Sequence, residues 1–600
     1  MSNRIHKREK IRFNKDLLDL KFIKRILAVV WSCNKKLTIY RFTLLVLQAI
    51  IPFIPLYLMK LLLDAFAAGS PERSYIYWIL AGFAIVKIVS IIFSNMSSYV
   101  SMLHSDVIAD HMSHIVISKA INIDLEYFDS DRFHDIFARA IGQSSGLPLQ
   151  VLSTVMGLFT NLITLIAVAG VLFTLHWGIA LILFFVAIPA ALIRWHYTEK
   201  TVELREQQTQ RERRSGYLRG VLTGRGYAKE VRIFDFGNFL LLQFLNLRSI
   251  LRKEKRDLYL KQNVSIGMAQ SVEAVAVIGA LGYIATWVIR GLITVGDIAM
   301  YYGVFQKGQS GINGVLKSFV SLHSNRLFLG HLFEFLDLEP KIADSLDTVD
   351  LKEKINTISI ENLSFIYPGT QRTVLDNINL EIHAGEIIAI VGENGSGKST
   401  LIKLINRLYE PTIGSIKING KQLKQFSLHS FRKKLTVIFQ LFSKYNASVN
   451  ENIQYSDIHH KGGKSKIVEA AQFAHSDDFI SMLPQQYDTQ LGRSFRQGEE
   501  LSGGQWQKLA LTRAFYKDAD IIVLDEPTSF IDPIAEEDIF SNLRKLNKDK
   551  IMILITHRIY NLKMADRIFV MDSGKIIETG SHPELIKQDG LYKEMFDKQS

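Results

Sequence analysis

The stretch IIAIVGENGSGKST, residues 387–400, decides the fold of the second half of the chain. It opens with a short apolar run, Ile387–Val391, which has the length and composition of a buried strand. A glycine-rich turn then leads to Lys398, and an apolar helical pattern follows over Leu401–Leu408. A strand, a glycine-rich turn and a helix in this order predict a phosphate-binding loop. A glycine-rich turn without a ligand is the alternative, and it leaves the strand and the helix unexplained.

The residue types in this loop suit the phosphates of ATP. Glycines let backbone N–H groups approach the phosphates, and the start of the helix adds the positive end of its dipole. Lys398 is predicted to neutralise the β- and γ-phosphates, and the Ser399 hydroxyl to hold Mg²⁺. The ATP-binding residues predicted in this loop are Gly392, Glu393, Asn394, Gly395, Ser396, Gly397, Lys398, Ser399 and Thr400.

A second buried strand, within IIVLDE at residues 521–526, ends in two carboxylates. Open sheets of parallel strands bind ligands at their carboxyl ends, which is where Asp525 emerges. We expect Asp525 to hold Mg²⁺, directly or through water, and Glu526 to orient or deprotonate the attacking water. A strand that ends in Asp-Glu is a weak signal alone, but it is a strong one after a phosphate-binding loop in the same domain.

Between these two elements lies LSGGQ at residues 501–505. This pentapeptide is the signature of the ATP-binding cassette (ABC) superfamily, which the chain therefore resembles. The resemblance implies that the signature opens a helix and contacts the γ-phosphate of ATP held by a second cassette. The residues given this role are Leu501, Ser502, Gly503, Gly504 and Gln505.

Four further positions match motifs of the family in the expected order. The resemblance implies that Tyr367 stacks on adenine and that Gln440 binds at the ATP site and senses Mg²⁺. It also places Asp532 in the loop between cassettes and His557 at the γ-phosphate, where His557 joins Lys398 and Glu526 as a catalytic residue. Taken singly, Tyr367 could be a packing aromatic, Gln440 a loop amide and His557 a core histidine. Their joint order and spacing favour the functional interpretation.

The first half of the chain carries long apolar runs of the length that a bilayer demands, about 20 residues each. The alternative is a set of buried helices in a large soluble protein. Because the number of predicted spans is even, the chain ends on the same side of the membrane as it begins. The six predicted spans are 37–63, 75–102, 151–175, 178–193, 264–289 and 295–320, the last being interrupted by Lys307, Gln309 and Asn313.

The predicted architecture is an all-α transmembrane domain of six helices, exporter type, fused to an α/β P-loop nucleotide-binding domain. Residues 1–36 form a basic cytoplasmic segment with an interfacial elbow helix, and 37–335 form the transmembrane domain. A linker covers 336–354, and the nucleotide-binding domain covers 355–600. Six spans followed by one cassette is the layout of an exporter half-transporter.

The net charge of +12 does not predict a nucleic-acid partner, because the basic residues flank apolar segments. They crowd the N-terminus and the stretch 194–261, which places both, with the nucleotide-binding domain, on the cytoplasmic side of the plasma membrane. The single cysteine, Cys33, excludes an intramolecular disulfide. We expect no removable secretory signal and no peptidase domain before the spans.

Intact motifs predict a homodimer, because two identical chains would complete two competent ATP sites. One departure from the family is Phe530-Ile531, where small residues are usual. The inner connections between spans are long and helix-forming. Turns near Tyr127–Asp129 and Lys229–Phe234 resemble the coupling helices that link cassette and membrane domain in exporters, although each could be an ordinary connection.

The segment at residues 491–507, ahead of and through the signature, resembles nisin-type lantibiotic exporters. This resemblance implies export of a ribosomally made, modified peptide, with peptide-modifying enzymes as possible partners of the same system. Export of a drug, a lipid or another small amphipathic substrate is the alternative. Lys87 and Glu273 are costly in lipid, so they either line a substrate cavity or pair with each other or with backbone at a helix interface.

Two further hypotheses assign the chain to other classes of protein than an exporter. A soluble chromosome-maintenance ATPase shares the cassette motifs, and the apolar spans argue against it. A cassette that gates a channel or regulates a partner without pumping is disfavoured by the intact Glu526.

Overall fold

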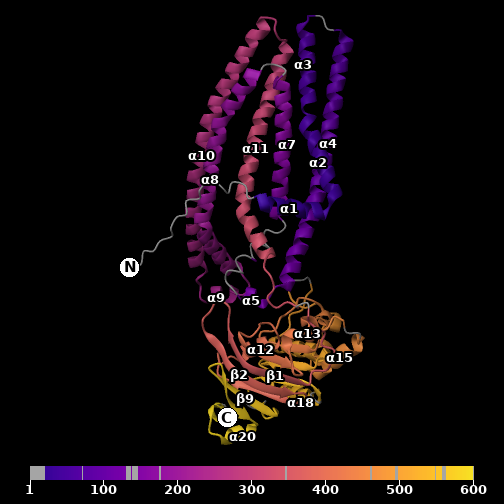
Figure 1. Cartoon of the computed structure of the whole chain (residues 1–600), viewed down its shortest axis with the longest axis vertical. Coiled ribbons are helices and arrows are strands. Elements are labelled where there is room, and N and C mark those ends of the chain that lie inside the picture. Colours follow the sequence, from indigo (N-terminus) through magenta and orange to yellow (C-terminus); the bar gives the residue numbers. More distant parts are fainter. Residues whose placement is uncertain are drawn as a thin grey trace, which may run out of the picture. The chain divides into compact units, whose positions relative to one another are not determined.

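The computed structural model describes residues 20–598, except 70–71, 130–136, 138–145, 174–176, 345–346, 460–461, 494–496, 547–548, 557 and 559–561. The chain divides into two compact units (Figure 1). Unit 1 comprises Met1–Ile121 and His134–Leu338, and unit 2 comprises Asn122–Phe133 and Glu339–Ser600.

Unit 1 is helical throughout the part that the structure describes. Pro52, which has no N–H to donate, separates the second helix from the third, and a capping box of Thr294 and Asp297 starts the last one. The helices are α1 (Leu20–Cys33), α2 (Lys35–Ile50), α3 (Phe53–Ala67), α4 (Arg73–Asn122), α7 (Gly146–Phe173), α8 (Trp177–Thr223), α9 (Ala228–Ile233), α10 (Gly237–Ile289) and α11 (Val295–Leu336).

Four stretches of unit 1 are long and apolar enough to cross a membrane: Lys35–Ala67, Arg73–Asn122, Pro148–Phe173 and Gly237–Ile289. They contain the predicted first, second, third and fifth spans, apart from the residues outside the described ranges. Helices α8 and α11 lie at the fourth and sixth spans without meeting the same criterion in the described residues, so the count of six stays a prediction. The predicted helical connections are confirmed by α4, α8 and α10, which continue far beyond the spans.

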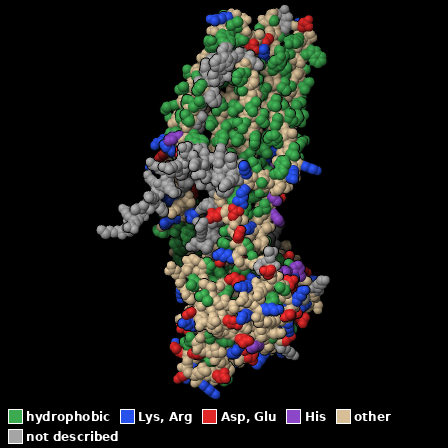
Figure 2. Space-filling view, viewed as in Figure 1, with side chains coloured by type: hydrophobic (Ala, Val, Ile, Leu, Met, Phe, Trp, Pro, Cys, Tyr) green, Lys and Arg blue, Asp and Glu red, His purple; other side chains and the backbone are tan. Residues whose placement is uncertain are grey.

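Part of the surface of unit 1 is apolar, as a lipid environment requires. Figure 2 shows hydrophobic side chains gathered over its helices, whereas charged side chains of both signs are spread over unit 2. Large apolar side chains are exposed along two of the candidate spans, including Trp78, Ile85 and Ile92 on α4 and Val272, Val275 and Ile278 on α10.

Glycines explain how α11 accommodates a close neighbour. Helices α7 and α11 pack against each other, and a Cβ at Gly308 would lie 3.0 Å from Val168 Cγ1. A Cβ at Gly311 would lie 3.1 Å from Leu165, and one at Gly314 would overlap Asn161. Small residues let helix backbones approach closely within a membrane. The glycines of α11 therefore let it pack closely against α7.

Unit 2 contains two sheets, and the larger one is mostly parallel, as predicted. Its order is β10-β9-β3-β8-β7-β6, with β10 as the antiparallel edge strand. These strands are β3 (Ile387–Gly392), β6 (Leu435–Ile438), β7 (Ile521–Asp525), β8 (Ile551–Ile555), β9 (Arg567–Asp572) and β10 (Lys575–Gly580).

The second sheet is antiparallel and was not predicted. Its order is β2-β1-β4-β5, and the strands are β1 (Thr357–Ile366), β2 (Thr373–His383), β4 (Ile413–Ile418) and β5 (Lys421–Gln422). The helical elements of unit 2 are α5 (Leu125–Phe128), α12 (Lys398–Ile405), η1 (Leu423–Gln425), α13 (Leu428–Lys433), α14 (Val449–Gln454), α15 (Gly463–Phe473), α16 (Asp477–Ile480), η2 (Gln486–Asp488), α17 (Gly503–Tyr516), α18 (Pro533–Leu546), α20 (His582–Lys587) and α21 (Leu591–Asp597).

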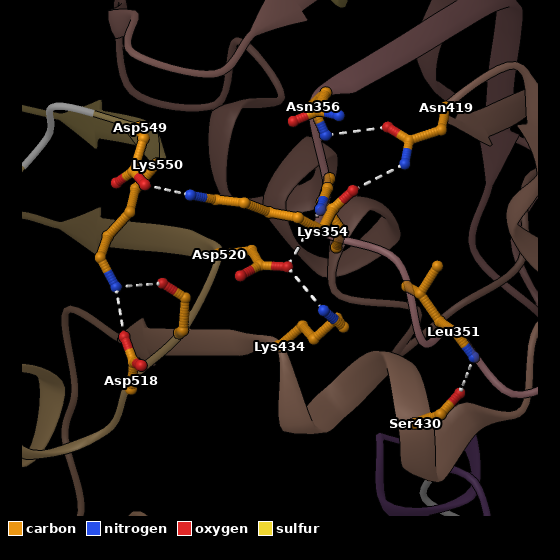
Figure 3. Close-up of polar contacts among 12 residues, drawn as sticks. Leu351, Lys354, Asn356, Asn419, Ser430, Lys434, Asp518, Asp520, Asp549 and Lys550 are labelled. Atoms are coloured by element: carbon orange, nitrogen blue, oxygen red, sulfur yellow. Dashed lines mark hydrogen bonds and ion pairs between the residues drawn. The ribbon is translucent and has the colours of Figure 1, made fainter.

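The chain leading into β1 is fastened to unit 2 as a strap, defined here as residues 349–356. Val349 N–H donates to Gln425 O (2.9 Å), and Leu351 N–H donates to Ser430 Oγ (2.9 Å). Further along, Ile355 N–H donates to Asp520 Oδ2 (3.0 Å), which also accepts from Lys434 Nζ. Figure 3 shows the contacts of Leu351 with Ser430 and of Asp520 with Lys434, together with those of Lys354, Asn356 and Asn419. Leu351 and Ile355 are buried in the core that this strap covers.

The short helix α5, at the first predicted coupling turn, belongs to unit 2 by its contacts. Asp124 accepts from the Lys341 N–H (2.5 Å), and the Tyr127 hydroxyl donates to Glu339 O (3.1 Å). Asp129 accepts from the Tyr409 hydroxyl (2.5 Å) and lies 3.6 Å from Lys403 Nζ. Helix α9 in unit 1 lies at the second predicted turn. The coupling role of both segments stays a prediction.

Candidate functional site

The carboxyl ends of β3, β7 and β8 meet at one edge of the parallel sheet, beside a cavity of about 730 Å³. All three strands are buried along their whole length, which fixes the side chains that follow them. The predicted residues that line the cavity are Glu393, Asn394, Gly395, Ser396, Gly397, Lys398, Ser399, Thr400, Gln440, Asp525 and Glu526.

Two glycines of the loop after β3 are required by the backbone. Gly392 has φ +152°, and a Cβ there would overlap the carbonyl oxygen of Met571. Gly397 has φ +105° and forms the N-cap of α12, and a Cβ there would lie 2.6 Å from Leu375 Cδ2. Because both positions lack room for a side chain, the backbone can wrap closely around a ligand.

Lys398 starts α12 with its side chain folded into this loop. Its Nζ donates to Gly392 O and Glu393 O, both at 2.8 Å, and contacts Ser396 Oγ at 3.4 Å. Burial lowers the pKa of Lys398, and the nearby Asp525 and Glu526 carboxylates act in the opposite direction. The ammonium group is therefore held among backbone carbonyls, where phosphate oxygens could replace them as acceptors.

The two carboxylates after β7 have different surroundings. Asp525 is 6% exposed and bonds to Ser399, and burial raises its pKa to about 6, with the Glu526 charge as a second cause. Glu526 has the left-handed φ of +49°, and its Oε2 accepts from Gln440 Nε2 at 2.9 Å. Asp525 is thus a buried carboxylate of the kind that binds metals, and its neighbour Glu526 lines the cavity.

The raised pKa of Asp525 predicts how the stability of the nucleotide-free protein depends on pH. The folded value lies above the ordinary 3.8, so ionised Asp525 costs roughly 3 kcal/mol above about pH 6. This cost disappears as the pH falls toward 4, because the unfolded chain keeps its charge longer than the folded one. We expect Asp525→Asn to raise the unfolding temperature at pH 7.5 and to lose about half of this advantage at pH 5. An equal difference at both pH values would contradict the assignment.

The donor set fits Mg²⁺, although it is not a complete metal site. Among the described residues, no group of three or more His, Cys, Asp and Glu side chains could hold a metal by itself. Mg²⁺ is usually bound by one or two carboxylates together with substrate phosphates and water. Ser399, Gln440 and Asp525 supply oxygen ligands of this kind at the cavity.

Tyr367 lies beside the cavity and is not among its lining residues. Its hydroxyl bonds to Thr400 Oγ1 (3.0 Å), and its ring packs edge-on against Tyr409, with centroids 5.4 Å apart. Lys403 Nζ lies 5.4 Å from the centre of the same ring. The packing interpretation and the adenine-stacking interpretation therefore both remain compatible with its position.

The signature residues lie outside this cavity. Ser502 caps α17, since its hydroxyl accepts from Gln505 N–H (3.3 Å) and its own N–H donates to Gln505 Oε1 (2.8 Å). Leu501 is buried, whereas Ser502 and Gly503 are exposed. Asp532 is exposed at the start of α18, and its Oδ1 accepts from Ala535 N–H. His557 lies outside the described residues.

Sequence reasoning missed part of the cavity wall. Arg372, Thr373 and Val374 line it from β2 and the turn before it, and Asp572, Ser573 and Gly574 line it from the turn between β9 and β10. Asp-Ser-Gly after an apolar run is a turn signal. Since β9 is parallel to β3, this turn falls on the same sheet edge, but the strand order is needed to know it.

Unit 1 contains its own cavity of about 670 Å³, formed by α3, α10 and α11. Its wall is mainly apolar, with Gln270, Tyr302, Gln306 and Gln309 as polar groups. Glu273 is buried on α10 between the lining residues Gln270 and Ala274, and Lys87 is exposed on α4. Among the described residues neither Lys87 nor Glu273 lines this cavity, and no ion pair joins them. Their role in substrate binding stays a prediction.

Comparisons with known proteins match both units. The family model "ABC transporter" matches residues 375–529, and "ABC transporter transmembrane region" matches residues 37–307. The chain is 30% identical over 597 residues to the subtilin transport ATP-binding protein SpaT of Bacillus subtilis, covering 99% of this chain and 96% of that protein. It is 27% identical over 572 residues to the nisin transport ATP-binding protein NisT of Lactococcus lactis, covering 95% of each.

Two further relatives broaden the comparison. An ATP-dependent lipid A-core flippase of Haemophilus ducreyi is 29% identical over 601 residues, covering 97% of this chain and 99% of that protein. A solved structure, "Structure of a bacterial Atm1-family ABC exporter with ATP bound", superposes with a TM-score of 0.80 at 23% identity. It covers 94% of this chain and 98% of that chain, which shows a shared fold.

Proposed function

The chain belongs to the ABC transporter family as an ATP-driven exporter, and from that premise we propose that it exports a ribosomally made, modified peptide of the lantibiotic class. The observation that carries the proposal is the similarity to the subtilin and nisin transport proteins, which extends over at least 95% of the chain. The membrane half, which contacts a substrate, is thus included in the resemblance.

The cavity of unit 2 supports ATP binding by the following division of roles. Lys398 and the backbone of residues 393–397, which line the cavity, hold the β- and γ-phosphates. Tyr367, whose hydroxyl bonds to the lining residue Thr400, is proposed to stack on adenine. Bound Mg²⁺ would neutralise charge on the phosphates, held by Ser399, Gln440 and Asp525. Glu526 accepts the proton of the attacking water, and His557 contacts the γ-phosphate.

We propose that two copies of the chain share each ATP at their interface. The support is that Ser502 and Gly503 are exposed at the start of α17 and take no part in their own chain's cavity. Asp532 is likewise exposed, directly before α18. A homodimer with two-fold symmetry then completes two equal ATP sites.

Coupling to transport follows from differential binding. ATP favours the closed pair of cassettes over the open pair, and only this difference can change which side the membrane domain faces. A nearly complete switch needs about 5.5 kcal/mol of such preference. Helices α5 and α9 are the segments proposed to transmit it, with the nucleotide-binding domain and N-terminus on the cytoplasmic side.

The cavity of unit 1 supports an amphipathic cargo. Its wall offers apolar contact and amide or hydroxyl groups from Gln270, Tyr302, Gln306 and Gln309, and no charged side chain lines it among the described residues. Such a surface suits apolar side chains of a peptide whose backbone keeps some hydrogen bonds.

The proposal is tested in vesicles that contain the purified protein. We expect a leader-bearing precursor of the nisin kind to raise ATP hydrolysis and to accumulate on the side away from the nucleotide-binding domain. The Glu526→Gln protein serves as the control that binds peptide without transporting it.

Lipid export is the second candidate, because relatives of similar identity are named as lipid A-core flippases. The same vesicles should be assayed with a lipid A-core glycolipid. Stimulation and movement of the glycolipid in place of the peptide would overturn the peptide proposal and leave the exporter assignment intact.

A further inference from the structure

Gln507 is buried on the signature helix α17, and both the nitrogen and the oxygen of its side-chain amide form hydrogen bonds. Its side chain is 2% exposed. Its Nε2 donates to the carbonyl oxygen of Glu526 (3.1 Å), and its Oε1 accepts from Phe530 N–H (2.7 Å). One side chain thus joins α17 to the turn that carries Glu526 and to the loop that leads to Asp532.

The turn that Gln507 holds is strained. Glu526 has φ +49°, a conformation that costs a non-glycine residue energy and persists only where its surroundings impose it. Its N–H donates to Ile555 O (2.9 Å), and its carbonyl oxygen accepts from Ser529 Oγ (3.1 Å) as well as from Gln507. These bonds fix the backbone that aims the Glu526 carboxylate at the cavity.

The same helix begins with the signature. Ser502 and Gly503 are exposed there, whereas Gln507 lies on the buried side. Gly504 packs closely against the loop that contains Phe530, since a Cβ at position 504 would lie 2.8 Å from Phe530 O. A helix rises 5.4 Å per turn, so Ser502 and Gln507 are little more than one turn apart on a rigid element.

We infer that Gln507 is a positioning residue for the Glu526 of its own chain, acting from the helix whose exposed start meets the partner's ATP. The second half of this inference rests on the proposed pairing of two chains. Gln507 is not among the residues that line the ATP cavity, so it acts by holding the Glu526 backbone and the Phe530 N–H in place. In the dimer, one rigid helix then belongs to both ATP sites.

The first test separates positioning from binding. Gln507→Met removes both hydrogen bonds with little change in volume. Gln507→Glu keeps an acceptor for the Phe530 N–H but puts a carboxylate oxygen against the carbonyl oxygen of Glu526. We expect both to lower kcat for ATP by about 10- to 100-fold, with KM for ATP changed less than about 3-fold. Thr512→Val is the matched control, because Thr512 is buried on the same helix and bonds to Ser476 and Lys508 instead.

The outcomes of this test decide the inference. An equal loss in Thr512→Val, or a rise in KM without a fall in kcat, would overturn it. Should Gln507→Met fail to give folded protein, Gln507→Glu decides in the same way.

The second test uses mixed dimers in which only one chain keeps Glu526. In the first, Gln507→Met is placed in the chain with Glu526, opposite a Glu526→Gln partner. In the second, Gln507→Met and Glu526→Gln are combined in one chain, opposite an unmodified partner. We expect only the first dimer to lose activity relative to an unmodified chain paired with Glu526→Gln.

Loss in the second dimer alone, or equally in both, would overturn the inference. Failure of the proposed pairing gives a different result. A single chain would then hydrolyse ATP without a partner, while the Gln507→Met effect on kcat could still be measured.

Discussion

Replacing Glu526 by glutamine is expected to lower the rate of ATP hydrolysis by about 100- to 10,000-fold while ATP still binds. The amide keeps the size of the carboxyl group and can still meet Gln440, whose Nε2 lies 2.9 Å from Glu526 Oε2. It cannot accept a proton from water. The ATP-bound state should therefore persist, and transport should stop after one closure.

This prediction is checked by measuring ATP turnover and bound nucleotide in the same preparation. Glu537→Gln is the matched control, because Glu537 is exposed on α18 and outside the cavity. It should retain the activity of the unmodified protein. Cargo movement over many turnovers by the Glu526→Gln protein would refute ATP-driven export.

Replacing Lys398 by alanine is expected to weaken ATP binding by about 100-fold or more and to abolish hydrolysis. The Lys398 ammonium is the buried cation at the loop, and its present acceptors are Gly392 O and Glu393 O. Without it, the phosphates in the cavity lose a compensating ammonium group and keep only the backbone N–H groups and the helix dipole, and the two carbonyls lose their donor.

Binding of a fluorescent ATP analogue measures this effect directly. Lys444→Ala removes an exposed lysine of the same unit and should bind the analogue as the unmodified protein does. Nucleotide affinity within a few-fold of normal in Lys398→Ala would contradict the role of the loop.

Local sequence signals predicted the parts of the fold in which neighbouring residues decide the structure. Residues 387–391 and 521–525 are buried strands as expected, because continuous apolar runs suit strands covered on both faces. The helix after the phosphate-binding loop begins at Lys398, earlier than its apolar pattern, because Gly397 caps it directly. The antiparallel sheet escaped prediction, since its strands pair only through long-range register.

The candidate site also contains residues that local motifs predicted and residues that they did not. Residues 393–400, Gln440, Asp525 and Glu526 were recognised from motifs, and they line one cavity. Asp572–Gly574 were not recognised, because only the strand order brings their turn to this edge. The contacts of Gln507 escaped for a similar reason: a glutamine in a helix carries no signal of the backbone groups that it will bind.

The strap at residues 349–356 sets a limit on dissecting this protein for solution work. A fragment of the ATPase cut at Ile355 would lack Leu351 from its core and leave Gln425 O and Ser430 Oγ without the amides that now occupy them. An excised domain should therefore start upstream of Val349, and activities compared between shorter and longer fragments would partly measure the missing strap.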